Sequence, residues 1–145
     1  MKLEKWLPLA ILAVIVSVFG VWTALNQSGA TAQHISGQWT LTTASDATGD
    51  IDVSPTALVV TIDDKTINGK VCNGFGGDYT LNGATVKVGS LAQTEMYCTT
   101  PDGIMELESR FLTALHHANT VHFEGTNLVL TGVDIRLVFA QSTPD

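Results

Sequence analysis

Three histidines in the second half of the chain are the side chains best suited to bind a transition metal. His116 and His117 are adjacent, and His122 follows in the next predicted strand. Imidazole nitrogens are good ligands for zinc and copper. Adjacent residues on a helix project about 100° apart, so both cannot easily face one ion together with His122. The spacing makes a metal-binding sensor or enzyme an alternative interpretation rather than the leading one.

An acidic loop offers a second hypothesis of this kind. Asp46, Asp50 and Asp52 lie in residues 44–55, a segment rich in Asp, Ser, Thr and Gly. Carboxylates are the ligands that calcium prefers, but their spacing departs from the calcium-loop template. A solvated acidic loop is therefore favoured over a calcium site.

Cys72 and Cys98 are the two cysteines of the chain. With no third candidate, they can form one intramolecular disulfide. The bridge would close a loop of about 26 residues and add about 3 kcal/mol of stability in the chain-entropy model. Two thiols are too few for a four-ligand zinc site. Two buried free thiols are the alternative.

A glycine-rich segment spans residues 69–79. Gly69 and Gly77 mark places where the backbone turns sharply or passes close to a neighbour. Asn73 could satisfy backbone groups of the loop, and Tyr79 could bury its ring and hydrogen-bond its hydroxyl. We predict a structural role for this segment, with a ligand contact as the alternative.

The sequence holds no recognisable catalytic constellation. A hydrolase needs a nucleophile with a base, or paired carboxylates in a cleft. No serine lies in a nucleophile-elbow motif. Glu106 and Glu108 are two positions apart on a predicted helix and face different sides. We therefore expect neither enzyme activity nor a cofactor.

The N-terminus predicts export. Residues 7–25 carry no charge and follow Lys2 and Lys5, a pattern that keeps the N-terminus in the cytoplasm. The small residues 30–32 could be cleaved by a signal peptidase, while the apolar run also approaches the roughly 20 residues that span a bilayer. We predict that residues 1–32 are a signal peptide or a single-pass transmembrane helix, and that the remainder is extracytoplasmic: periplasmic, secreted or tethered to the inner membrane.

The exported part is acidic. Of fourteen acidic and seven basic residues, all but Glu4, Lys2 and Lys5 follow residue 32. This balance disfavours binding to nucleic acid or to an anionic membrane surface.

Residues 33–141 are predicted to form one domain, followed by a tail at 142–145. Short β-rich runs separated by turn residues predict an antiparallel sheet; they lie at 38–43, 56–62, 66–72, 78–81, 85–91, 93–98, 120–124, 127–131 and 135–140. Curling would hide the edges of such a sheet. The expected fold is mainly β: a small antiparallel barrel-like sheet, of the lipocalin-like topology class, with one packed α-helix.

The helix is predicted after Thr100, with Pro101 at its first position and Asp102 in its first turn. Apolar residues then recur at spacings of three and four, which gives one stripe to pack on the sheet; they are Ile104, Leu107, Phe111, Leu115 and Ala118.

A glycine-cysteine-asparagine segment with a Gly-x-Tyr close is formed by Gly69, Cys72, Asn73, Gly77 and Tyr79, and a threonine-x-methionine-x-cysteine segment by Thr94, Met96 and Cys98. Through these two segments, residues 37–139 resemble the META domain family of small bacterial envelope proteins. Two departures are the absence of a lipid-attachment cysteine and Val71 at a position where a second glycine is common.

The resemblance implies a small antiparallel barrel without established catalytic residues. The family includes heat-shock-associated (HslJ-like) envelope lipoproteins linked to novobiocin resistance. We expect a non-catalytic envelope protein with a stress- or antibiotic-resistance-associated role, acting as a structural or binding module. Its expected partners are another envelope protein or a small apolar ligand, and the membrane if the N-terminal segment is retained.

Overall fold

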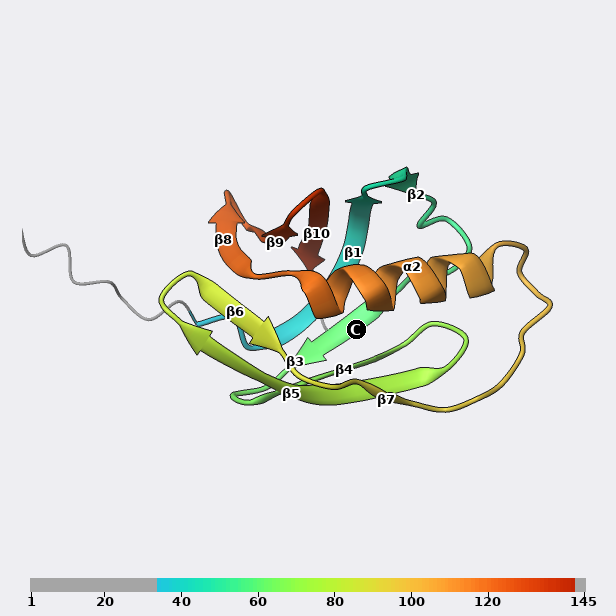
Figure 1. The fold of residues 1–145 in the computed structure, drawn as a ribbon, viewed down its shortest axis with the longest axis horizontal. Coiled ribbons are helices and arrows are strands. Elements are labelled where there is room, and N and C mark those ends of the chain that lie inside the picture. The colour runs from blue at the N-terminus through green and yellow to red at the C-terminus, as the bar shows by residue number, and fades with distance from the viewer. Residues whose placement is uncertain (1–33, 143–145) are drawn as a thin grey trace, which may run out of the picture. The chain divides into compact units, whose positions relative to one another are not determined.

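An antiparallel β-sheet and one helix make up residues 34–142, the part of the chain that the computed structural model describes (Figure 1). The predicted signal peptide or anchor, residues 1–32, lies outside the described residues, as does most of the predicted tail. Within residues 34–142, no helix combines the length and the apolar character needed to cross a bilayer. The predicted class, mainly β with one helix, is confirmed.

Ten strands and helix α2 (Ile104–His117) follow one another along the chain. The strands are β1 (Gly37–Asp46), β2 (Gly49–Ile51), β3 (Val59–Ile62), β4 (Thr66–Lys70), β5 (Gly74–Asn82), β6 (Thr85–Val88), β7 (Ala92–Gln93), β8 (Thr120–Glu124), β9 (Asn127–Gly132) and β10 (Ile135–Gln141). The end of β1 and all of β2 occupy part of the segment 44–55, which was predicted as a loop.

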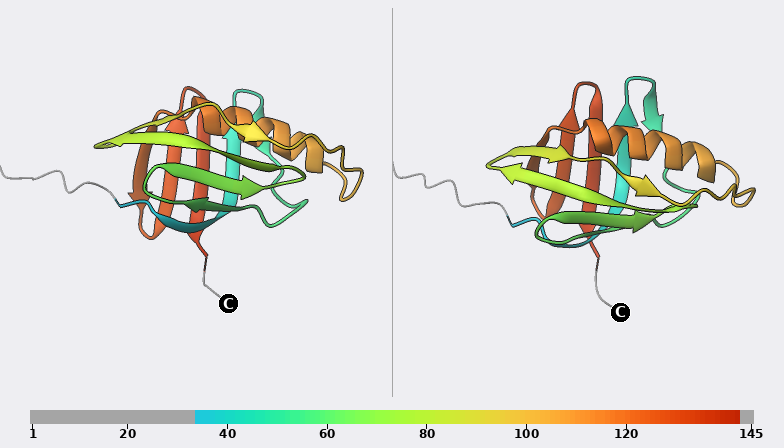
Figure 2. Two further views of the ribbon diagram at one scale, coloured as in Figure 1. Left: turned by 90° about the horizontal axis from the view of Figure 1, so that it is seen from below. Right: turned by 60° about the horizontal axis from the view of Figure 1, so that its bottom comes forward.

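Every strand pairing is antiparallel, in the order β10-β9-β8-β6-β5-β4-β3-β1-β2, and β1 also pairs with β10. The contact between β6 and β8 is short, with the single register pair Thr85–Thr120. The path of pairings that starts at β1 therefore returns to β1. The views in Figure 2 show β8, β9, β10 and the second half of β1 standing nearly upright, with β3 to β7 crossing in front of them.

Helix α2 runs between these two groups of strands (Figures 1 and 2). Its predicted apolar stripe is buried, and Phe111 is fully enclosed. The ring of Phe111 lies edge-on to Phe75 of β5 at 5.7 Å between centroids and to Phe139 of β10 at 6.4 Å. Because aromatic rings favour such edge contacts, one helical residue joins both groups of strands.

The predicted start of the helix is wrong. Helix α2 begins at Ile104, after Gly103, whose φ of 78° is left-handed and cannot belong to a right-handed helix. Pro101 follows a cis peptide bond and lies in the preceding turn. The chain thus turns through Pro101 and Gly103 before it becomes helical.

The predicted strand 93–98 is also wrong beyond its first residue. Only Ala92 and Gln93 pair with β5. Residues 94–98 run without regular structure; the backbone groups of Met96 bond to a side chain, as described below, and the N–H of Thr94 donates to the carbonyl oxygen of Gly74.

Close backbone packing explains two glycines of the segment 69–79. A Cβ at Gly77 would lie 2.7 Å from the carbonyl oxygen of Ser90, and one at Gly69 would lie 2.6 Å from the ring of Phe75 and 2.9 Å from the carbonyl oxygen of Val59. Gly74 differs from both, since a Cβ there meets nothing within 4 Å.

The effect of an alanine substitution on stability should therefore differ between these glycines. We expect Gly77→Ala to lower the free energy of unfolding by about 1–3 kcal/mol, because the methyl group forces the backbone near Ser90 to move. Gly74→Ala, three residues away, should change it by no more than about 0.5 kcal/mol. Urea denaturation of both variants measures the difference, and equal stabilities would contradict the close-packing explanation.

Candidate functional site

Asn73 lies at the centre of the family-like motif and is 2% exposed. Its backbone N–H donates to Oε2 of Glu108 at 2.5 Å, and its side-chain Nδ2 donates to Oε1 at 2.7 Å. Glu108 belongs to α2 and is 4% exposed. Both carboxylate oxygens therefore hold the helix to the turn between β4 and β5.

The remaining hydrogen-bonding capacity of the Asn73 amide is directed at the segment 94–98. Its Oδ1 accepts the backbone N–H of Met96 at 2.7 Å and the hydroxyl of Thr94 at 3.0 Å, and Nδ2 also donates to the carbonyl oxygen of Met96 at 3.0 Å. The amide thus bonds both backbone groups of Met96, as a neighbouring strand would. The backbone of Met96 therefore needs no strand partner.

A disulfide joins Cys72 to Cys98 beside Asn73, with 5.9 Å between their Cα atoms, a usual separation for such a bridge. Cys72 is buried at 2% exposure. We call Asn73, Thr94, Met96, Glu108 and the disulfide the motif cluster. The motif cluster brings the turn at residues 72–73 and the segment 94–98, which lie more than twenty residues apart in the sequence, into direct contact.

Tyr79 lies apart from the motif cluster and does what its predicted role requires. Its ring is buried, and its hydroxyl donates to the carbonyl oxygen of Asp63 at 2.8 Å. Burial, together with the nearby charges of Asp64 and Asp63, raises the pKa of the phenol above its usual value. The hydroxyl therefore acts as a buried donor.

The structure does not bring the three candidate histidines together. The Nδ1–H of His116 donates to the carbonyl oxygen of Gly89, and that of His117 to the carbonyl oxygen of Thr113. His122 contacts the carboxylate of Glu124 on the same strand at 3.0 Å. Within residues 34–142, no group of three or more His, Cys, Asp or Glu side chains is placed to share an ion.

The three acidic candidates are engaged separately. Both carboxylate oxygens of Asp46 accept from Arg110, at 2.8 and 3.0 Å, and Thr48 adds two further bonds. Asp52 accepts the backbone N–H of Ser54, which lowers the pKa of its carboxyl group. Asp50 contributes its carbonyl oxygen to Arg110. The predicted pair of Arg110 with Glu106 is present at 3.6 Å, but Asp46 is the nearer partner.

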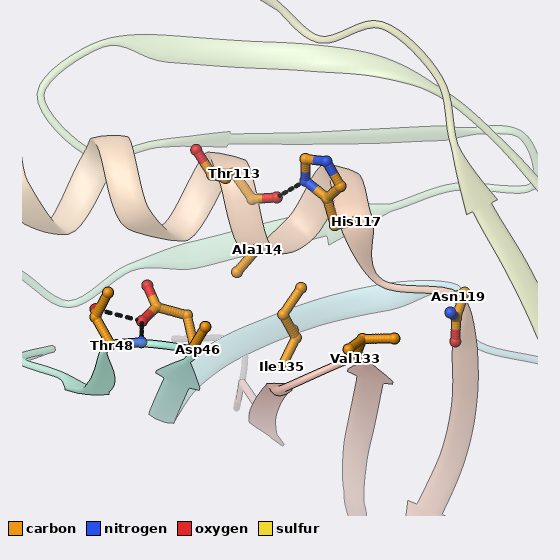
Figure 3. Close-up of a pocket in the computed structure, with 9 residues that line it drawn as sticks. Asp46, Thr48, Thr113, Ala114, His117, Asn119, Val133 and Ile135 are labelled. Atoms are coloured by element: carbon orange, nitrogen blue, oxygen red, sulfur yellow. Dashed lines mark hydrogen bonds between the residues drawn. The ribbon is translucent and has the colours of Figure 1, made fainter.

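A pocket of about 380 Å³ lies where the second half of α2 faces the β1–β2 and β9–β10 turns. Figure 3 shows Asp46 and Thr48 at one end, Asn119 at the other, and Ile135 and Val133 between them below Ala114 of the helix. Its lining residues are Asp46, Ala47, Thr48, Thr113, Ala114, His117, Asn119, Val133 and Ile135. None of them belongs to the motif cluster.

A comparison of the sequence with known families identifies the family of this chain. The family model for the META domain matches residues 32–144. The chain belongs to the META domain family. No curated protein matches the sequence.

Solved structures share the fold of this META domain at low sequence identity. An NMR structure of a protein from Burkholderia xenovorans has a TM-score of 0.61 at 24% identity, over 75% of this chain and 83% of that one. The crystal structure of a DUF4847 family protein from Bacteroides vulgatus has a TM-score of 0.53 at 18% identity, over 76% and 95%. At these identities the likeness concerns the fold alone.

Sequence reasoning missed the role of Glu108. As a catalytic partner of Glu106 it faces a different side of the helix, and its resemblance, with Phe111 and Leu115, to the helix of the family gives its carboxylate no bonding partner. Yet Glu108 lies four residues after Ile104 and three before Phe111, so it falls on the buried stripe of the helix. A carboxylate on an apolar face needs a buried partner, and that rule would have singled it out.

We predict that Glu108→Gln lowers the free energy of unfolding by about 1–3 kcal/mol. A glutamine has one acceptor oxygen, so one of the two donors of Asn73 would be left without its partner. Glu106→Gln, at an exposed position of the same helix, is the matched control and should change stability by about 0.5 kcal/mol at most. Urea denaturation measures both variants; a Glu108→Gln protein as stable as the control would refute the stabilising role of the carboxylate.

Acid should weaken the Asp46–Arg110 contact. Hydrogen bonds from Arg110 and then from Thr48 hold the pKa of Asp46 well below its usual value of 3.8. A carboxyl group whose pKa is lower in the folded state stabilises the fold above its unfolded pKa, and that stabilisation is lost as the pH falls towards the folded pKa. We therefore expect stability to decline below about pH 5.

This decline should be shallower in Asp46→Asn, which removes the titrating group. Asp50→Asn is the control, because no hydrogen bond to the Asp50 carboxylate is found within residues 34–142. Unfolding midpoints measured from pH 7 to pH 2.5 compare the three proteins. An unchanged acid slope in Asp46→Asn would show that other groups control it.

Proposed function

We propose that this META domain is a non-catalytic module outside the cytoplasm that binds another molecule or supports an envelope structure. The observation that carries the proposal is the motif cluster. Its amide, carboxylate and sulfur groups are all engaged with one another. Side chains committed in this way hold a fold together and are not free to attack or protonate a substrate.

The cysteine pair supports the extracytoplasmic location. Disulfides persist in oxidising compartments and are rare in the cytosol. The apolar residues 7–25 behind two lysines are consistent with export. Whether through a retained anchor or after cleavage, we place the domain on the outer side of the inner membrane.

The barrel-like form expected from the sequence is part of the same proposal. The return of the pairing path to β1 through β10 supports it. A strand circuit that pairs its own edges resists joining to other sheets, which suits a protein that must stay soluble under stress. The stress- and antibiotic-related role rests on the family resemblance.

The location and the bridge can be tested on the native protein. We predict an intact mass two daltons below that of the reduced chain, and activity of a C-terminal alkaline-phosphatase fusion, which requires export. Replacement of both cysteines by alanine should lower the free energy of unfolding by about 3 kcal/mol, since a loop with a sequence separation of 26 is released.

Two results would contradict the proposal. One is a fully reduced protein whose alkaline-phosphatase fusion is inactive. The other is turnover of a substrate that is abolished by a single substitution while the fold is retained.

A further inference from the structure

We propose that the pocket between α2 and the β9–β10 turn binds a small neutral molecule with an apolar body and one hydrogen-bond donor. The inference rests on the proposed function as a binding module and assigns the site and the class of ligand. Its volume of about 380 Å³ falls within the range of small-molecule sites, about 300–1,000 Å³.

The middle of the pocket is apolar. Ala114 of α2 faces Ile135 and Val133 across the gap (Figure 3), and Ala47 of the β1–β2 turn adds a further methyl group. Ala114 is 1% exposed and belongs to the core. A ligand bound here would therefore contact a surface that the hydrophobic core already holds in place.

Val133 is the most unusual of these residues. It lies in the β9–β10 turn next to Asp134, whose φ is 57°, and it is 81% exposed. Turns of this kind favour small and polar residues, so the structure gives no folding reason for a branched apolar side chain. As a wall of the pocket, the Val133 side chain has a functional reason, because the apolar body of a bound ligand would cover it.

One uncommitted hydrogen-bonding group lies beside the C-terminal end of α2, the side-chain amide of Asn119 (Figure 3). His117 also lines this end, but its Nδ1–H is engaged by the carbonyl oxygen of Thr113 at 2.8 Å, and its other ring nitrogen points away from Val133 and Ile135. Among residues 34–142, no side-chain hydrogen bond involves the amide of Asn119. Its amide oxygen offers an acceptor for a hydroxyl or N–H group of the ligand.

The opposite end of the pocket disfavours a charged ligand. The negative charge of Asp46 is already compensated by the guanidinium of Arg110, and Thr48 adds two more bonds. A charged ligand would lose hydration here without gaining an unpaired opposite charge. The site therefore selects for a neutral molecule.

Three two-ring probes separate these features: 2-naphthol, 2-methoxynaphthalene and naphthalene-2-sulfonate. The first is neutral with a donor, the second lacks the donor, and the third is charged. In calorimetric titrations of the full-length protein, we expect 2-naphthol to bind at one saturable site. The methoxy compound should bind about three- to tenfold more weakly, for the loss of one hydrogen bond, and the sulfonate more weakly than either.

Val133→Ser and Asn119→Ala locate the binding. Both should weaken 2-naphthol by at least threefold, while Asn119→Ala should also reduce its advantage over the methoxy compound. Tyr97→Ser is the matched control, because Tyr97 is equally exposed at 82% and lies outside this pocket. Unfolding curves verify that the variants remain folded. Each substitution is made in a separate protein, so that if one variant fails to fold the other still tests the site.

Absence of saturable 2-naphthol binding, or equal binding by Val133→Ser and Tyr97→Ser, overturns the inference. Equal affinity for 2-naphthol and the methoxy compound overturns the requirement for a donor, and tighter binding of the sulfonate overturns the selection for a neutral ligand. An exported, oxidised protein that fails these titrations leaves the proposed function intact. Conversely, a reduced cytoplasmic protein that binds 2-naphthol at Val133 would support this inference and contradict the extracytoplasmic part of the proposed function.

Discussion

A buried carboxylate on a helix is the constraint on which the rest of this structure depends. Removing a charged group from water costs several kcal/mol unless hydrogen bonds replace its hydration. Glu108 receives two short bonds from Asn73, one from the backbone and one from the amide. Helix and turn must therefore meet in one register. The same amide then fixes the segment at Met96, and the disulfide joins that segment to the turn covalently.

This constraint changes how the family-like residues are understood. Polar residues and cysteines that recur in a motif invite a catalytic explanation, yet here each contacts another member of the motif cluster. Their spacing along the chain is set by the distance between a turn, a loop and a helix. The polar groups and sulfurs of the motif cluster are engaged with one another, whereas the pocket beside Val133 is formed by turns and the far half of the same helix.

Local patterns predicted the elements well where short-range physics decides them. The predicted runs 78–81 and 85–91 form the β5–β6 hairpin, in which Asn82 pairs with Thr85. Gly83, the first turn residue, has a positive φ of 60° that glycine favours. The apolar stripe of α2 was predicted because helical periodicity shows which face is buried. Errors arose where distant contacts decide: residues 94–98 have the composition of a strand, but the amide of Asn73, more than twenty residues earlier, bonds both backbone groups of Met96 in their middle.

The pocket could not be predicted for the same reason, although its components were visible. Asp46 was considered for calcium and His117 for zinc, each from its neighbours in sequence. The structure instead places both residues along one pocket, because α2 crosses above the ends of β1 and β10 (Figure 3). The pocket depends on the core for its shape, through Ala114, but its exposed wall, Val133, contributes nothing to that core. Binding at this site can therefore change by substitution in one turn while the motif cluster keeps the fold intact.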